Sequence, residues 1–175
     1  MRIIAGDWRG RRLHPLKGRG VRPTTDRVRE AWMSALGGRL DGLTVVDLFA
    51  GSGALGLEAA SRGAARVVLV ERARSSLRVI ESNVALLDAA DRVEVVAGDV
   101  FRFLRDLEEE AFDVALADPP YGTGDAMRLV EAWRARPFAS SLWVEHPSRE
   151  SMPDADPVRV RRYGDTALTT YLSQP

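Results

Sequence analysis

The chain has 175 residues and a mass of 19.2 kDa, the size of one domain with a sizeable core. It contains no cysteine, which excludes disulfides, iron–sulfur clusters and cysteine nucleophiles, and its two histidines, His14 and His146, stand far apart. We therefore expect no metal cofactor. No apolar run approaches the roughly 20 residues that span a bilayer. The first residues lack the apolar core of a signal peptide, so we expect a cytoplasmic protein with no membrane contact.

Charge is distributed unevenly, although Lys+Arg and Asp+Glu each number 25. Residues 1–40 contain ten basic and three acidic residues, which leaves a net charge of +7 there and −7 over residues 41–175. Arginine dominates the basic set, and its planar guanidinium suits phosphate and can stack on bases. The pattern favours a nucleic-acid contact surface; the alternative is a solvated face. The residues expected to contact nucleic acid are Arg9, Arg11, Arg12, Lys17, Arg19, Arg22, Thr24, Thr25, Arg27 and Arg29.

Glycine and proline divide the first 22 residues into short apolar pieces, which predict a small hairpin and then a basic loop. A helix start at residues 23–26 is followed by apolar residues at helical spacing, until Gly37 and Gly38 end the pattern. From Leu43 onward, predicted strands and helices alternate. The expected strands are 44–50, 66–71, 92–97, 112–118 and 141–146, the expected helices are 54–62, 73–87, 100–110 and 125–136, and a hairpin of 158–163 and 167–172 closes the chain.

This alternation predicts an α/β fold. We expect a seven-stranded, mostly parallel, Rossmann-like sheet with helices on both faces and a C-terminal antiparallel hairpin. Residues 1–40 are expected to form a basic N-terminal extension of hairpin, loop and helix, packed on a domain of residues 41–175 rather than around a second core.

A glycine-rich loop follows the first strand of this alternating region. Residues 51–56 read G-S-G-A-L-G, which fits G-x-G-x-x-G between a strand and a helix, and Glu71 ends the next strand 20 residues after Gly51. Glycines let the backbone approach a nucleotide closely, and a carboxylate in this place can accept hydrogen bonds from ribose hydroxyls. The alternative is a tight turn with a surface acid. A nucleoside-containing cofactor fits better, either a dinucleotide or S-adenosylmethionine.

Two further acids favour S-adenosylmethionine over a dinucleotide. Asp47 lies within the strand that precedes the loop, where its charge would repel a pyrophosphate but suits loop anchoring or a cationic ammonium group. Asp99 follows the third strand of this region, where its carboxylate can accept from an adenine amino group. A nicotinamide dehydrogenase is therefore disfavoured.

Residues 118–121 read D-P-P-Y directly after an apolar strand, at the edge of the sheet where open α/β folds bind ligands. The prolines fix the backbone, so that the Asp118 carboxylate and the Pro119 carbonyl can both accept from one exocyclic amine. Such acceptors favour a nitrogen whose lone pair can attack a methyl group, and they stabilise the charge that develops there. Tyr121 offers a face on which a base can stack. The alternative is a rigid proline turn.

These residues resemble class I methyltransferases that modify exocyclic amines, and more narrowly the RsmD family of 16S rRNA guanine-N2 methyltransferases. The resemblance covers nearly the whole chain and lies in residues 2–6, 22–31, 47–58, 71, 98–99, 118–121 and 163–166. It implies S-adenosylmethionine as cofactor and Asp118, Pro119, Pro120 and Tyr121 at the target base. The expected cofactor-binding residues are Asp47, Phe49, Ala50, Gly51, Ser52, Gly53, Glu71, Arg72, Gly98, Asp99, Val100 and Asp118.

The leading hypothesis is S-adenosylmethionine-dependent methylation of a guanine N2 amine in 16S rRNA. The resemblance implies that the substrate is a small ribosomal subunit or an assembly intermediate, and we expect a monomer. Two alternatives stay open: a DNA adenine-N6 or cytosine-N4 methyltransferase, which would share the D-P-P-Y run, and a non-catalytic RNA-binding factor in ribosome assembly.

Overall fold

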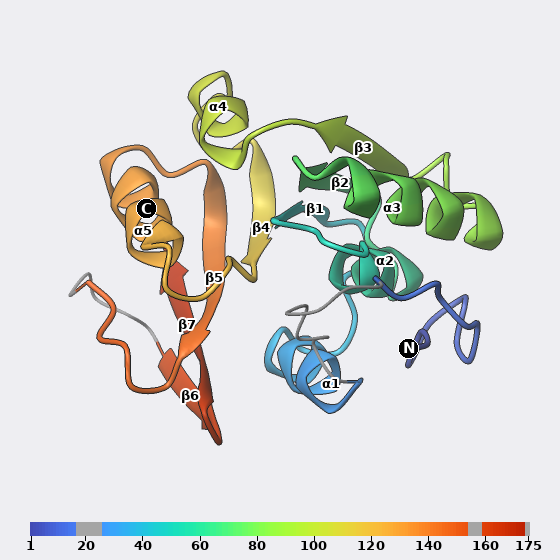
Figure 1. Ribbon diagram of the computed structural model, residues 1–175, viewed down its shortest axis with the longest axis horizontal. Helices are drawn as coiled ribbons and strands as arrows, with labels where there is room; N and C mark the ends of the chain where they lie inside the picture. Colours follow the sequence, from blue (N-terminus) through green and yellow to red (C-terminus); the bar gives the residue numbers. More distant parts are fainter. Residues whose placement is uncertain (17–25, 154–158, 174–175) are drawn as a thin grey trace.

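The computed structural model describes residues 1–16, 26–153 and 159–173, and it contains one seven-stranded sheet in the order β3-β2-β1-β4-β5-β7-β6 (Figure 1). The strands are β1 (Thr44–Leu48), β2 (Arg66–Glu71), β3 (Val93–Ala97), β4 (Phe112–Ala117), β5 (Ala139–Pro147), β6 (Arg159–Tyr163) and β7 (Thr166–Leu172). The helices are α1 (Asp26–Ala35), α2 (Ala54–Ser61), α3 (Arg74–Leu87), α4 (Val100–Arg105) and α5 (Asp125–Ala135).

The first five strands are parallel, and β7 pairs antiparallel with both β5 and β6. The central strands β1, β2 and β4 are almost wholly buried apolar runs, as expected for parallel strands covered by helices on both faces. The predicted fold class is confirmed, including the C-terminal antiparallel hairpin.

Two elements differ most from the sequence prediction, and the other bounds agree to within two residues. The helix expected over residues 100–110 ends at Arg105, because four of the next five residues are acidic and negative charge is unfavourable at a helix C-terminus. The fifth strand is longer than expected, since β5 runs over Ala139–Pro147 in register with β7 along most of its length.

The N-terminal extension shares the core of the sheet domain. Ile3, Leu13 and Trp32 are buried in the same apolar cluster as Leu57 of α2 and Leu69 of β2. A second cluster fills the opposite face of the sheet, between the strands and helices α4 and α5. The extension therefore completes one face of the core.

The predicted N-terminal hairpin exists in a short form. The Ile3 amide donates to the Arg11 carbonyl at 2.9 Å, and the Gly10 amide donates to the Ile3 carbonyl at 2.9 Å. Only one ladder bridge forms in this part of the described chain, between Arg2 and Arg12. So few bonds cannot hold a hairpin alone, and side chains of α2 supply the rest.

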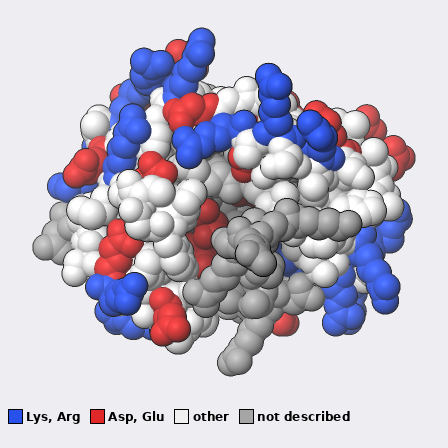
Figure 2. Space-filling view, viewed as in Figure 1, with Lys and Arg blue, Asp and Glu red and all other residues white. Residues whose placement is uncertain are grey.

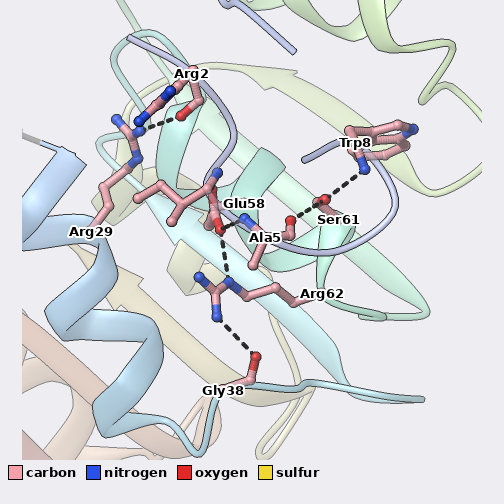
Figure 3. Close-up of polar contacts among 9 residues, drawn as sticks. Arg2, Ala5, Trp8, Arg29, Gly38, Glu58, Ser61 and Arg62 are labelled. Atoms are coloured by element: carbon pink, nitrogen blue, oxygen red, sulfur yellow. Dashed lines mark hydrogen bonds and ion pairs between the residues drawn. The ribbon is translucent and has the colours of Figure 1, made fainter. Parts of the chain in front are cut away.

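Glu58 and Ser61 of α2 bind this segment through its backbone (Figure 3). The fully buried Glu58 carboxylate accepts from the Ile4 amide at 2.8 Å, the Ala5 amide at 3.0 Å and Arg62 Nε at 2.8 Å. The Ser61 hydroxyl donates to the Ala5 carbonyl at 2.6 Å and accepts from the Trp8 amide at 3.0 Å. A buried carboxylate with this set of donors is satisfied, so Glu58 is structural.

Candidate functional site

The candidate site lies at the carboxyl ends of β1, β2, β3 and β4. In the observed order, the chain runs outward from β1 to β3 and then returns to place β4 on the other side of β1. Open α/β sheets bind ligands at such a switch point. The loop after β1 and the D-P-P-Y run after β4 are therefore neighbours. Figure 2 shows acidic side chains in the hollow at the centre of this face of the molecule.

The glycine loop has the geometry that the sequence predicts. Gly51 and Gly53 adopt φ angles of 58° and 77°, a left-handed conformation that other residues avoid. Gly56 permits close packing of α2 on the sheet, since a Cβ there would lie 2.3 Å from Leu69 Cδ2. The Asp47 Oδ2 accepts from the Gly56 amide at 2.8 Å, so Asp47 anchors the start of α2. Of the two roles expected for Asp47, this geometry supports loop anchoring.

Burial, with smaller contributions from the charges of Asp118 and Glu71, raises the pKa of Asp47 to about 7, although the hydrogen bond from the Gly56 amide opposes the shift. The Asp47 side chain is 1% exposed. The charges of Asp118 and Glu71 both act on Asp47, so it lies near the two carboxylates that were expected at the target base and at the cofactor.

Glu71, the acid expected to bind the cofactor, also binds the glycine loop. Its Oε2 accepts from the Gly51 amide at 2.9 Å, and its Oε1 accepts from the Arg72 amide at 2.8 Å and the Ala73 amide at 2.7 Å. A carboxylate offers about four acceptor positions. One acceptor position therefore remains for a ribose hydroxyl.

Asp99 caps α4 and keeps one oxygen toward solvent. Its Oδ1 accepts from the Phe101 amide at 3.0 Å and the Arg102 amide at 3.1 Å, and its Oδ2 lies 3.8 Å from Arg72 Nη1. With its side chain 47% exposed, Asp99 can still accept from an adenine amine through Oδ2. Val100 is buried as the first residue of α4, and the Gly98 amide donates to the Glu71 carbonyl at 2.9 Å.

The remaining predicted cofactor residues line the turn after β1. Phe49 has a φ of 63°, which is unfavourable for an L residue, and its ring meets Phe101 edge-on with centroids 6.1 Å apart. The Ala50 amide donates to the Val70 carbonyl at 3.0 Å, and the Ser52 carbonyl accepts from Asn83 Nδ2 at 3.0 Å. The turn is thus fixed from β2 and α3, and local strain of this kind is common at ligand sites.

The D-P-P-Y run places an acid and an exposed ring at the end of β4. Asp118 is half-buried, Pro119 is buried, and the Tyr121 side chain is 39% exposed. The Pro120 carbonyl accepts from the Thr123 hydroxyl at 2.8 Å, which closes the turn before α5. Burial, with smaller contributions from Glu145 and Asp118, raises the pKa of Tyr121 to about 12, although the hydrogen bond with Thr166 opposes the shift. Tyr121 therefore stays protonated and presents a neutral ring beside Asp118.

Glu145 is a site residue that sequence reasoning missed. It lies on β5 and is 6% exposed; its Oε1 accepts from the Tyr121 hydroxyl at 3.1 Å and its Oε2 accepts from Trp32 Nε1 at 3.2 Å. The Tyr121 hydroxyl also lies 3.1 Å from Thr166 Oγ1. The available signal was a single acid inside the apolar run Leu142–His146, because a buried strand acid needs partners.

Comparison with known proteins decides the family. Residues 1–172 match the family model described as "Conserved hypothetical protein 95". The chain is 41% identical to "Ribosomal RNA small subunit methyltransferase D" of Escherichia coli K12 over 158 residues, which cover 87% of this chain and 78% of the relative. The chain belongs to the RsmD family.

Other members show the same likeness over their full length. The chain is 32% identical to the "Putative rRNA methyltransferase YlbH" of Bacillus subtilis, with 98% of each protein covered. The solved structure of the "Putative methyltransferase yhhF from Escherichia coli" superposes with a TM-score of 0.83 at 33% identity, covering 98% of this chain and 97% of that chain. The fold of this RsmD-family chain is therefore that of a class I methyltransferase.

The structure separates the basic residues that the sequence grouped together. Arg9 and Arg12 are exposed, and Arg11 is exposed with its Nη2 donating to the Leu86 carbonyl at 2.5 Å. Arg29 is 0% exposed and its Nη2 donates to the Arg2 carbonyl at 2.6 Å, so the prediction that Arg29 contacts nucleic acid is wrong. Lys17, Arg19, Arg22, Thr24 and Thr25, and the side chain of Arg27, lie outside the described residues.

A second group of basic side chains was not anticipated. In Figure 2, blue side chains gather along the upper margin of this face, where the same view in Figure 1 shows α4. Arg72, Arg102 and Arg128 are exposed and follow the carboxyl ends of β2, β3 and β4, and the Arg128 guanidinium stacks 3.7 Å from the Phe101 ring centroid. We call these three residues the arginine rim.

Within the described ranges, no helix is long and apolar enough to span a membrane. The same part of the chain holds no cluster of three or more His, Asp or Glu side chains suited to a metal ion.

Proposed function

We propose that this protein transfers the methyl group of S-adenosylmethionine to the exocyclic N2 amine of a guanine in 16S rRNA. The observation that carries the proposal is the parallel pairing of β1 with β4, in which Leu48 lies opposite Ala117, so that the glycine loop and the D-P-P-Y run begin side by side. The relatives named as ribosomal RNA methyltransferases support rRNA as the substrate.

S-adenosylmethionine, when bound, supplies an electrophilic methyl group. Glu71 would accept from a ribose hydroxyl, Asp99 Oδ2 would accept from the adenine amine, and the turn of Phe49, Gly51 and Gly53 would follow the rest of the molecule. Three of the four acceptor positions of Glu71 already bind backbone amides, so the loop is preorganised for its ligand. Preorganised donors and acceptors need no rearrangement at the moment of reaction.

Asp118 and the Pro119 carbonyl accept hydrogen bonds from the two hydrogens of the guanine amine. This directs the nitrogen lone pair toward the methyl group and stabilises the positive charge that develops on nitrogen. One N–C bond forms as the methyl leaves sulfur, and the nitrogen then loses one of its protons. Tyr121 stacks on the base, which must first leave its own stack in the RNA.

RNA on either side of the target is held by exposed arginines of the extension and by the arginine rim. In this proposal residues 1–40 form the RNA-contacting extension, residues 41–175 form the methyltransferase domain, and the protein acts as a cytoplasmic monomer on a small subunit or an assembly intermediate. Arg9 and Arg12 of the extension have exposed side chains, and both suit phosphate.

The test is methyl transfer from isotope-labelled S-adenosylmethionine to 16S rRNA, free or in small subunits, taken from a strain that lacks the corresponding methyltransferase. Mass spectrometry of nucleosides should show N2-methylguanosine. Asp118→Ala should bind cofactor normally and react roughly 10² times more slowly, the scale of losing one preorganised contact.

Labelled adenine or cytosine in duplex DNA would instead identify a DNA methyltransferase. RNA binding without turnover on any of these substrates would identify a non-catalytic assembly factor. Either result would contradict the proposal, as would Asp118→Ala turning over at the rate of the parent protein.

A further inference from the structure

Asn83 of α3 joins the N-terminal segment to the glycine loop. Its side chain is 0% exposed and makes three hydrogen bonds to backbone groups. Its Oδ1 accepts from the His14 amide at 2.7 Å, and its Nδ2 donates to the His14 carbonyl at 3.1 Å and to the Ser52 carbonyl at 3.0 Å. A carboxamide is the neutral side chain that offers one acceptor and two donors in this arrangement.

Other contacts between the same two segments agree with this connection. A Cβ built on Gly51 would lie 3.6 Å from Leu16 Cδ1, so the Leu16 side chain packs over the loop. The Ser52 hydroxyl lies 3.8 Å from the Met1 sulfur. Leu13 is 5% exposed in the core, which fixes the chain just before His14. Residues 13–16 and the glycine loop thus form one packed unit.

The attachment at Asn83 differs from the attachment at α2. The side chains of Glu58 and Ser61 bind residues 4, 5 and 8 of the extension, whereas Asn83 binds both His14 and Ser52 of the glycine loop. Because the same Asn83 carboxamide bonds both residues, a shift of the Ser52 carbonyl changes the hydrogen bonds that hold His14. In sequence, the expected RNA-contacting residue Lys17 comes three positions after His14.

We propose that Asn83 is a positioning residue that couples cofactor binding at the glycine loop to docking of residues 13–16. The inference rests on the proposed function, because it takes S-adenosylmethionine as the ligand of the loop. Coupling between two sites is reciprocal: a cofactor that fixes the Ser52 carbonyl strengthens docking at His14, and docking at His14 strengthens cofactor binding by the same factor. A cofactor-loaded enzyme would then hold the start of its RNA-binding segment more firmly.

The test measures amide hydrogen exchange at His14 by NMR, with and without saturating S-adenosyl-L-homocysteine, together with calorimetric affinity. In the parent protein we expect the cofactor product to slow exchange at His14 by about fivefold or more, the lower range of typical coupling. Asn83→Ala should abolish this response and weaken affinity by a similar factor. Asn83→Asp keeps the acceptor for the His14 amide but places a carboxylate against two carbonyls, so it should also lose the response.

Ser61→Ala is the matched control, because it removes contacts to Ala5 and Trp8 and leaves residues 13–16 untouched. It should speed exchange at the Trp8 amide while the response of His14 to ligand persists. Unfolding curves identify any variant that fails to fold. If Asn83→Ala fails to fold, the response of His14 in the Asn83→Asp protein tests the coupling. A parent protein that binds ligand without a response at His14 would overturn the coupling and leave the proposed function standing. An Asn83 variant that folds and keeps the full response would do the same, whereas a parent that binds no ligand would overturn both.

Discussion

The Tyr121 hydroxyl donates to Glu145 at 3.1 Å, and the other oxygen of the same carboxylate accepts from the Trp32 indole at 3.2 Å. One buried acid thus orients the ring proposed to receive the target base and also holds helix α1 of the extension. Trp32 is 1% exposed, so its indole N–H depends on a protein acceptor rather than on water. The extension is therefore tied to the target-base motif through Glu145, as it is tied to the cofactor loop through Asn83.

Glu145→Ala should lower the free energy of unfolding by roughly 1–3 kcal/mol, the cost of leaving a buried indole donor unsatisfied. Glu145→Gln should be much milder. Its amide oxygen can accept from Trp32, and its NH2 can donate to the Tyr121 hydroxyl, which is then free to donate its own hydrogen to Thr166. Urea unfolding of the three proteins measures the difference.

The titration of Tyr121 gives a second, spectroscopic test of Glu145→Gln. The Glu145 charge helps to raise the pKa of Tyr121, after burial, so Glu145→Gln should lower that pKa from about 12 toward the ordinary value of 10. Tyrosinate absorbance, corrected with Tyr121→Phe, reports it. Equal destabilisation by Ala and by Gln, which keeps the volume of Glu, would show that an amide cannot replace the carboxylate here. An unchanged titration would show that the charge of Glu145 does not act on Tyr121.

The sequence was sufficient for the fold and for the residues that follow the strands, because both depend on short-range patterns. Buried strands alternate with helices, and glycines or acids at strand ends fall at one edge of a parallel sheet. It was insufficient for contacts such as Trp32 with Glu145, 113 residues apart, which need the three-dimensional arrangement. It also counted Arg29 as surface charge, because composition alone does not show which face of a helix is buried.

The buried Asp47 predicts a specific dependence of stability on pH. Its pKa is near 7 in the folded protein and about 3.9 in an unfolded chain. Between those values the folded protein keeps a proton that the unfolded chain has lost, so stability should fall as pH rises from about 4 to 7 and then level off. The slope for this group is at most about 1.4 kcal/mol per pH unit.

Asp47→Asn removes the titration and keeps an oxygen that can accept from the Gly56 amide. The gap in unfolding free energy between variant and parent should widen in favour of the variant across that pH window and stay constant above it. Denaturant titrations at about one-unit steps measure it. Parallel curves for the two proteins would show that Asp47 is ionised throughout, with a pKa near its ordinary value.

In the extension, Arg9→Ala together with Arg12→Ala should weaken RNA binding and flatten its dependence on salt. Each lost phosphate contact lowers the single-strand salt slope by about 0.7, so two should lower it by roughly 1.4. Arg29→Ala is the contrast: its buried guanidinium holds the Arg2 carbonyl, so the variant should be less stable with an unchanged slope. A slope that fell for Arg29→Ala and not for the double variant would reverse this assignment.

The arginine rim gives the last prediction, because α4 and α5 begin at the carboxyl ends of β3 and β4, on the same edge as Tyr121. Arg102→Ala with Arg128→Ala should reduce the single-strand salt slope by roughly 1.4, as two lost phosphate contacts would. Arg134→Ala is a matched control, since Arg134 is also exposed on α5. It lies six residues after Arg128, about 9 Å farther along the helix and away from this edge. Cofactor affinity should be the same in the double variant, the control and the parent protein. Fluorescence anisotropy with a single-stranded RNA at several salt concentrations measures the slopes. If the double variant and the control gave the same slope as the parent, RNA would approach the site from the extension alone.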